Sequence, residues 1–177
     1  MNVSVLRIGH RTVRDDRITT HVALVSRALG CEEVYMTEVD DSIKQTVAEV
    51  NKRWGGGCGF KIEIVREWRH LVENWKKGGG KVVHLTMYGV DINDTKISHL
   101  RQENRILVVI GAAKVPRQMY DLADYNIAIR NQPHSEVAAL AIFLDRIFKG
   151  KQFEKHFNDA KLKIIPMTRG KKVVGFG

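Results

Sequence analysis

The sequence predicts an α/β domain built on a mainly parallel sheet with helices on both faces. Short apolar runs rich in β-branched residues alternate along the chain with segments of helical periodicity, the pattern of a parallel-sheet domain. The length of 177 residues suffices for one domain with a sizeable core and falls short of the length at which two are expected. We therefore expect one compact catalytic or binding unit.

The first half of the chain contributes strands and helices in alternation. Residues 3–8 read as the first strand, and Thr19 or Thr20 can cap a helix that runs to Leu29 and stops at Gly30. The elements expected next are a short strand at 34–36, a helix from 42 that ends before 55, a strand at 61–65 and a helix from 68 to 77, halted by the glycines at 78–80.

Three strand-like runs in the second half, at 82–87, 105–110 and 126–129, are expected to lie side by side and parallel. The helix over 137–148 has the clearest apolar stripe, with Pro133 near its start and Gly150 at its end. Ligands bind at the carboxyl ends of strands in open parallel sheets. The loops after these three strands, at 85–89, 110–116 and 128–136, are rich in small residues and free backbone groups, so together they form the candidate binding site, although any one alone could be a plain connection.

The excess of positive charge is concentrated near the end of the chain. The chain holds 29 Lys and Arg against 20 Asp and Glu, a formal net charge of +9, and residues 149–177 hold eight of these cations beside only Glu154 and Asp159. The strand-like stretches at 164–166 and 172–174 predict a small hairpin there. We expect a domain at 1–150 and a basic C-terminal extension at 151–177, with nucleic acid or another anion as partner.

Several classes of protein are excluded or disfavoured. No G-x-G-x-x-G follows a strand and no phosphate-binding P-loop occurs, which argues against dinucleotide oxidoreductases and P-loop nucleotidases. The seven histidines and two cysteines lack ligand spacing, so no metal site is expected. No stretch reaches the roughly 18 apolar residues of a membrane span. The N-terminus has no secretory pattern, and the cysteines suggest no disulfide scaffold, so a cytoplasmic protein is expected.

Three arginines, Arg11, Arg14 and Arg17, precede or open the first helix. They form either a solvated, ion-paired face or a phosphate-binding site, because a guanidinium matches phosphate geometry and helix N-termini attract anions. His21 and His134 flank helix starts. Each forms either a local hydrogen bond or a contact that positions substrate.

Four motifs in order give the chain a family resemblance. They are LRIGHR at 6–11 with RDDRITTHVAL at 14–24, IGAAKVP at 110–116 and NQPHSEVAALA at 131–141. With these motifs the chain resembles the archaeal tRNA cytidine 2′-O-methyltransferases of the SPOUT superfamily, which act on cytidine 56 of the T-loop. The resemblance covers essentially the whole chain.

The resemblance implies a C-terminal trefoil knot, a homodimer, tRNA as substrate and S-adenosylmethionine as methyl donor. The knot is not visible in periodicity, and threaded chains are rare in general. By position, the cofactor loops of the family correspond to Leu85, Ile110, Gly111, Ala112, Ala113, Lys114, Ala128, Ile129, Arg130, Asn131, Gln132, Pro133, His134 and Ser135.

The resemblance also points to a catalytic arginine on the first helix, a place that falls to Arg27. A guanidinium is a poor base, so stabilising a developing alkoxide or holding a phosphate are the easier roles. His21 stands about where related enzymes often have asparagine, and it either orients substrate or caps the helix. Arg11, Arg14, Arg17, Lys171 and Lys172 are expected to bind tRNA phosphates.

Two alternatives remain open from sequence. A tRNA-binding or maturation factor could keep the fold and the charge without performing transfer. A SPOUT methyltransferase could instead act on another RNA site, such as a ribosomal RNA ribose or a base nitrogen.

Overall fold

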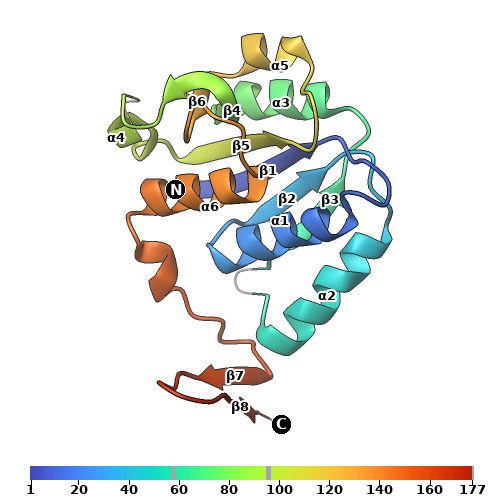
Figure 1. Ribbon diagram of the computed structural model, residues 1–177, viewed down its shortest axis with the longest axis vertical. Helices are drawn as coiled ribbons and strands as arrows, with labels where there is room; N and C mark the ends of the chain where they lie inside the picture. The colour runs from blue at the N-terminus through green and yellow to red at the C-terminus, as the bar shows by residue number, and fades with distance from the viewer. Residues whose placement is uncertain (57–58, 95–96, 177) are drawn as a thin grey trace.

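A computed structural model describes residues 1–56, 59–94 and 97–176, and it has a six-stranded parallel sheet between two layers of helices (Figure 1). The strands of this sheet are β1 (Asn2–Ile8), β2 (Glu33–Met36), β3 (Lys61–Ile64), β4 (Lys81–Asp91), β5 (Arg105–Gly111) and β6 (Tyr125–Ala128). The helices are α1 (Asp16–Ala28), α2 (Ser42–Trp54), α3 (Trp68–Lys77), α4 (Ile97–Leu100), α5 (Arg117–Leu122) and α6 (Glu136–Phe148).

The strands run in the order β3-β2-β1-β5-β4-β6, and every neighbouring pair is parallel. At the centre, Val5 of β1 lies between Val34 of β2 and Val108 of β5. The three strands of the second half lie next to one another, as predicted. The predicted α/β class with a mainly parallel sheet is therefore confirmed.

Both faces of the sheet are buried, which explains why its strands read as nearly continuous apolar runs. In β5, Ile106 and Val108 pack with α1, α2 and α6, whereas Leu107 and Val109 point to the other side and pack with α3 and α5. Figure 1 shows these two helical layers on opposite sides of the sheet. Helices on both faces were expected from the sequence.

Helix α1 begins earlier than the sequence predicts, at Asp16 rather than after Thr19 or Thr20. Asp15 occupies the N-cap position, and its backbone oxygen accepts a hydrogen bond from Thr19 N at 2.7 Å. Its side chain makes no capping bond because the guanidinium of Arg11 holds it. A side chain fixed from outside the helix thus sets where α1 starts.

Strand β4 is longer than expected and contains an irregularity. Its pairing with β6 shifts between Leu85 and Val90, so the residues between them leave the regular ladder. A Cβ on Gly89 would lie 2.5 Å from the backbone of Asn126, a distance that real Cβ atoms do not adopt. The absence of a side chain at Gly89 therefore lets this segment cross close to β6.

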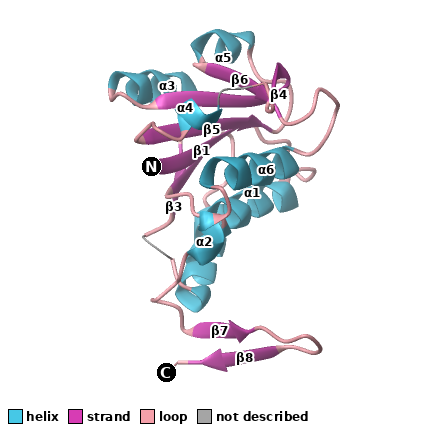
Figure 2. Cartoon of the chain, turned by 90° about the vertical axis from the view of Figure 1, so that its left-hand side faces the viewer, coloured by secondary structure: helices cyan, strands magenta, loops and turns pink. Residues whose placement is uncertain are grey.

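Helix α6 and the segment after it follow the sequence prediction. Ser135 caps α6 by accepting a hydrogen bond from Val137 N, and Lys149 and Gly150 end it with positive φ angles of 55° and 79°. The 3-10 helix η1 (Lys151–Glu154) follows, and strands β7 (Leu162–Ile165) and β8 (Lys172–Gly175) form an antiparallel hairpin. Figure 2 shows this hairpin projecting from the body of the molecule, beyond α2.

None of the helices in the described ranges is both long and apolar enough to cross a membrane.

Candidate active site

A cavity of about 1130 Å³ opens where the parallel strands β4, β5 and β6 end. Its walls come from the segments after these three strands, from the turn after β1 and from α5 and α6. The lining residues are Arg11, His84, Leu85, Thr86, Met87, Tyr88, Ile110, Gly111, Ala113, Lys114, Val115, Arg117, Tyr120, Asp121, Ile129, Gln132, Pro133, His134, Glu136 and Ala139. This is the edge of the sheet at which the sequence places the binding site.

His84 and Tyr120 form the polar floor of the cavity. His84 Nδ1 lies 2.9 Å from Asn126 Oδ1, and its ring meets the ring of Tyr120 edge-on with centroids 4.7 Å apart. Burial lowers the pKa of His84, and the hydrogen bond to Asn126 opposes this shift only in part. The Tyr120 hydroxyl reaches Thr86 Oγ1 at 3.2 Å. Burial therefore disfavours the charged form of His84, and the floor also carries the hydroxyl groups of Thr86 and Tyr120.

The three loops of the site are tied to one another. Asn131 Nδ2 donates to the backbone oxygens of Met87, at 2.8 Å, and of Gly89, at 2.9 Å, so the loop after β6 is fastened to the irregular part of β4. A Cβ on Gly111 would collide with the side chain of Val115, so the loop after β5 folds tightly on itself. These contacts tie the cavity walls to one another.

Most of the predicted cofactor residues line the cavity. The others are buried beside it, stabilise its loops or lie outside it. Ala112 and Ala128 are buried, Asn131 links two loops and Ser135 caps α6, whereas Arg130 is exposed outside the lining. The predicted residues that line the cavity are Leu85, Ile110, Gly111, Ala113, Lys114, Ile129, Gln132, Pro133 and His134.

The sequence does not place His84 and Tyr120 in the candidate site, and it includes Glu136 only as the last residue of the loop at 128–136. His84 lies inside a strand, Tyr120 lies on a helix of six residues, and both resemble core residues when read along the chain. Glu136 is the first residue of α6, where an acidic residue is ordinary for the helix dipole. Thr86, Met87 and Tyr88 belong to the loop at 85–89 that the sequence assigns to the candidate site, and all three line the cavity.

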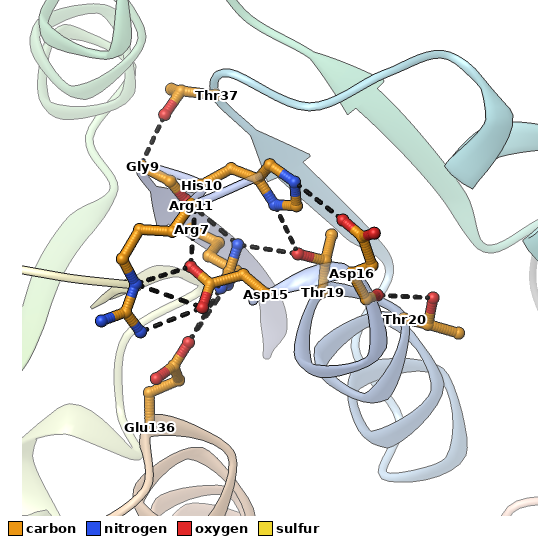
Figure 3. A network of polar contacts seen from close by, with 10 residues as sticks. All are labelled: Arg7, Gly9, His10, Arg11, Asp15, Asp16, Thr19, Thr20, Thr37 and Glu136. Atoms are coloured by element: carbon orange, nitrogen blue, oxygen red, sulfur yellow. Dashed lines mark hydrogen bonds and ion pairs between the residues drawn. The ribbon is translucent and has the colours of Figure 1, made fainter. Parts of the chain in front are cut away.

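The turn after β1 brings Arg11 to the cavity and anchors it through Asp15 (Figure 3). Arg11 donates to both carboxylate oxygens, with Nη2 2.9 Å from Oδ1 and Nε 3.2 Å from each oxygen, and its backbone N donates to Oδ2 at 2.9 Å. This bonding lowers the pKa of Asp15 to about 2. Asp15 is therefore ionised throughout the neutral range.

Arg14 is exposed on the same turn, and Arg17 and His21 are exposed on α1. Neither Arg14 nor Arg17 has an ion-pair partner within the described ranges. Of the two alternatives for this cluster, the ion-paired face describes Arg11, whereas the other two arginines are free to meet an anion.

Arg27 lies at the opposite end of α1 from the cavity. Its Nε donates to Asn51 Oδ1 at 2.8 Å, its Nη2 donates to the backbone oxygens of Trp54 and Gly55, and its guanidinium carbon lies 4.6 Å from the ring centroid of Phe157. Burial lowers the pKa of Arg27. Within one chain Arg27 lies away from the cavity, and the catalytic role expected from the resemblance stays a prediction.

Lys171 and Lys172 are exposed on the hairpin, which contacts the C-terminal end of α2 through a hydrogen bond from Lys161 N to Arg53 O at 3.0 Å. The structure therefore does not bring these lysines to the cavity. Lys171 and Lys172 instead place positive charge on the hairpin, away from the cavity.

Comparisons with known proteins agree with this site. A family model described as tRNA ribose 2′-O-methyltransferase, aTrm56, matches residues 54–174. The tRNA (cytidine(56)-2′-O)-methyltransferase of Cenarchaeum symbiosum is 53% identical over 98% of this chain and 97% of its own length. The enzyme of the same name from Nitrosopumilus maritimus is 54% identical over 98% and 96%.

Solved structures share the fold at low sequence identity. The SpoU methyltransferase AviRb from Streptomyces viridochromogenes, solved with its cofactor AdoMet, matches with a TM-score of 0.63 and 16% identity, over 85% of this chain and 58% of AviRb. A TrmH/SpoU tRNA-modifying enzyme of A. aeolicus matches with a TM-score of 0.60 and 15% identity, over 87% of this chain and 79% of that one. By its family match and its full-length relatives, this chain belongs to the aTrm56 family of tRNA ribose 2′-O-methyltransferases.

Proposed function

We propose that the chain transfers a methyl group from S-adenosylmethionine to the ribose 2′-hydroxyl of cytidine 56 in tRNA, and that the cavity after β4, β5 and β6 is the site of transfer. The observation that carries this proposal is that the cavity and the arginine-bearing turn after β1 lie together at one edge of the sheet, in a member of this family. Such a site holds a small cofactor beside the backbone of a nucleic acid.

The residues of the cavity fit the cofactor. Leu85, Ile110 and Ile129 give an apolar wall that suits a purine, and the hydroxyls of Thr86 and Tyr120 suit polar groups of the ribose or the amino-acid part. S-Adenosylmethionine supplies, when bound, a methyl group activated by a positively charged sulfur. The loops would hold it in a fixed place beside the acceptor ribose.

The RNA approaches from the side of the β1–α1 turn. Arg14 and Arg17 have no counter-ion among the described residues and bind backbone phosphates, with His21 beside them to orient the strand. Lys171 and Lys172 on the hairpin add phosphate contacts farther along the tRNA. Such contacts position the substrate and add salt dependence, but they read no base.

Two copies of the chain form the active unit in the cytoplasm, where tRNA is the substrate. What supports a dimer is the set of large apolar side chains exposed on α6 and on the C-terminal segment, which a second copy would cover. They are Ile142, Phe153, Ile164, Val173 and Phe176. Light scattering should give twice the 20.1 kDa of one chain, and a mass of one chain would contradict the dimer.

The test of the function is incubation of the purified protein with unmodified tRNA transcript and labelled S-adenosylmethionine. Nuclease digestion and mass spectrometry should find one methyl group on the ribose of cytidine 56, and a transcript with 2′-deoxycytidine at that position should gain none. Cofactor binding without transfer to any tRNA would favour the non-catalytic tRNA-binding factor. Transfer to ribosomal RNA or to a base would favour the other alternative.

A further inference from the structure

Arg7 is a buried cation that the proposed reaction does not use. Its side chain is wholly buried on β1, and it donates to Gly9 O at 3.1 Å, to Thr19 Oγ1 at 3.0 Å and to Glu136 Oε1 at 3.0 Å (Figure 3). Asp15 Oδ2 lies 3.6 Å from its Nη2. A buried ion pair of this kind adds little net stability compared with apolar packing, so its presence calls for another reason.

Arg7 contacts Asp15, which lies between Arg7 and the more exposed Arg11. Asp15 is 1% exposed and stands between the two arginines, with Arg7 behind it and Arg11 in front. Arg11 is the outer member, its side chain is 44% exposed, and it lines the cavity. Its Nη1 has no hydrogen-bond partner in the part of the chain that the structure describes, so a donor faces outward from a guanidinium whose back is fixed.

The turn that carries Arg11 is fastened at both ends. Gly9 N donates to Thr37 Oγ1 at 2.7 Å, and Asp15 N donates to Arg11 O at 2.9 Å. Because Glu136 opens α6 beside the loop after β6, Arg7 also ties this turn to the cavity wall. The position of Arg11 is thereby fixed relative to the cofactor site.

The charges of this cluster argue against a role for Arg11 as a phosphate anchor. Two guanidinium groups face two carboxylates, so the field of Arg11 is largely cancelled at a distance. Arg14 and Arg17 lack such partners among the described residues and are better placed to attract phosphate. A charge-balanced arginine held in a fixed orientation acts at short range, as a hydrogen-bond donor to one atom.

We propose that Asp15, backed by the buried Arg7, is a positioning residue that holds Arg11 as a short-range hydrogen-bond donor to the acceptor ribose at the edge of the cavity. This inference rests on the proposed function and assigns Asp15 and Arg7 tasks within it. Arg11 then acts on the reacting sugar, whereas Arg14 and Arg17 hold the RNA backbone.

The test compares Asp15→Asn with Asp16→Asn, which removes a carboxylate one residue along the chain whose side chain is 65% exposed. For Asp15→Asn we expect kcat to fall at least about tenfold, because the fork to Arg11 is lost, with unchanged Kd for S-adenosylmethionine and for tRNA. Asp16→Asn should keep kcat within about twofold of the wild-type value.

A double-mutant cycle separates positioning from a merely structural role. If Asp15 acts through Arg11, Asp15→Asn should cost little further kcat in an Arg11→Ala background. Effects that multiply as independent ones would overturn the proposal, as would an Asp15→Asn variant that changes tRNA affinity and its salt dependence at normal kcat.

Substitutions of Arg11, which lies outside the buried pair of Arg7 and Asp15, keep the proposal testable if Asp15→Asn does not fold. Arg11→Lys keeps the charge and loses the fork, so it should lose kcat as Arg11→Ala does, and normal kcat in both would overturn the proposal even if Asp15→Asn fails to fold. If the wild-type protein and Asp16→Asn transfer no methyl group to tRNA, the proposed function fails and this inference falls with it. Transfer by both, with normal kcat in the Arg11 variants, overturns the inference alone.

Discussion

Arg7 and Arg27 are both buried arginines, and their surroundings give them different tasks. Arg7 meets two carboxylates beside the cavity, whereas Arg27 meets an amide oxygen, two backbone oxygens and the ring of Phe157 at the other end of α1. The contacts of Arg27 join α1 to the end of α2 and to the segment that leads into the hairpin. Arg27 thus fastens the base of the C-terminal extension.

Arg27→Ala should therefore lower stability more than catalysis. The substitution leaves Asn51 Oδ1 and two backbone oxygens without their donor, a loss that we expect to cost about 2–4 kcal/mol of unfolding free energy. Thermal melting and turnover per folded molecule are the measurements, with exposed Arg53→Ala as the control that keeps the wild-type melting temperature. Loss of turnover at an unchanged melting temperature would instead establish the catalytic role expected from the resemblance.

His84 should make stability depend on pH. Burial lowers its pKa in the folded protein below the ordinary value of 6.5, so the folded ring stays neutral where the unfolded one binds a proton. Unfolding then takes up a proton, and the free energy of unfolding falls as pH drops through about 6.5, by at most about 1.4 kcal/mol per pH unit. Chemical denaturation between pH 8 and 5.5 should show a shallower slope for His84→Gln, with exposed His70→Gln as control. Equal slopes would contradict this assignment.

At the scale of elements, the sequence predicts most of the sheet because its strands are buried on both faces and bounded by turns. Two details escape it, and both are set by contacts distant in sequence. The irregular part of β4 depends on Asn131 and on the close passage of Gly89 over β6. The start of α1 depends on Asp15, whose side chain is held by Arg11 instead of capping the helix.

The candidate site could be predicted in position and only partly in its residues. Its loops were found because parallel strands end at one edge of a sheet. Arg27, expected to be catalytic from the resemblance, follows Asp16 by eleven residues, and a rise of 1.5 Å per residue places it about 16 Å down the helix, so its catalytic role stays a prediction. The sequence does not reveal that Arg7 pairs with Asp15. Each of the two reads as an ordinary charged residue until the fold brings them together.

The hairpin should supply a separable share of the tRNA contacts. Lys171 and Lys172 are exposed, and each phosphate contact contributes a little under one unit to the slope of log affinity against log salt. The double variant Lys171→Ala/Lys172→Ala should lower that slope by about 1.5 and weaken binding, measured by filter binding over a range of salt concentrations. Lys77→Ala, at the end of α3 on the other side of the sheet, is the control that keeps the slope. An unchanged slope in the double variant would remove the hairpin from the RNA-binding surface.

At the scale of the whole molecule, charge and catalytic machinery are separated. The cavity and the arginine turn lie at one edge of the sheet, whereas the hairpin projects beyond α2 (Figure 2). Residues 161–177 contain five of the 29 Lys and Arg and none of the 20 Asp and Glu. The hairpin is mostly exposed, and its link to the body runs through Lys161 N and Arg53 O. This division predicts that the hairpin serves tRNA binding and leaves cofactor binding to the body.

Truncation after Ala160 tests this division, because the shortened chain keeps Phe157, which packs against Arg27 of α1, and Asp159, which accepts a hydrogen bond from Gly56 N after α2. The truncated chain should bind S-adenosylmethionine as the full chain does, because every residue that lines the cavity lies in the part that is kept. Its tRNA affinity should fall by at least about tenfold at physiological salt, since five cations are lost. A full-length variant with these five residues replaced by Gln separates charge from bulk, and it should match the truncated chain in tRNA affinity if charge dominates. Normal tRNA affinity in both, or loss of cofactor binding on truncation, would show that the hairpin belongs to the catalytic body instead.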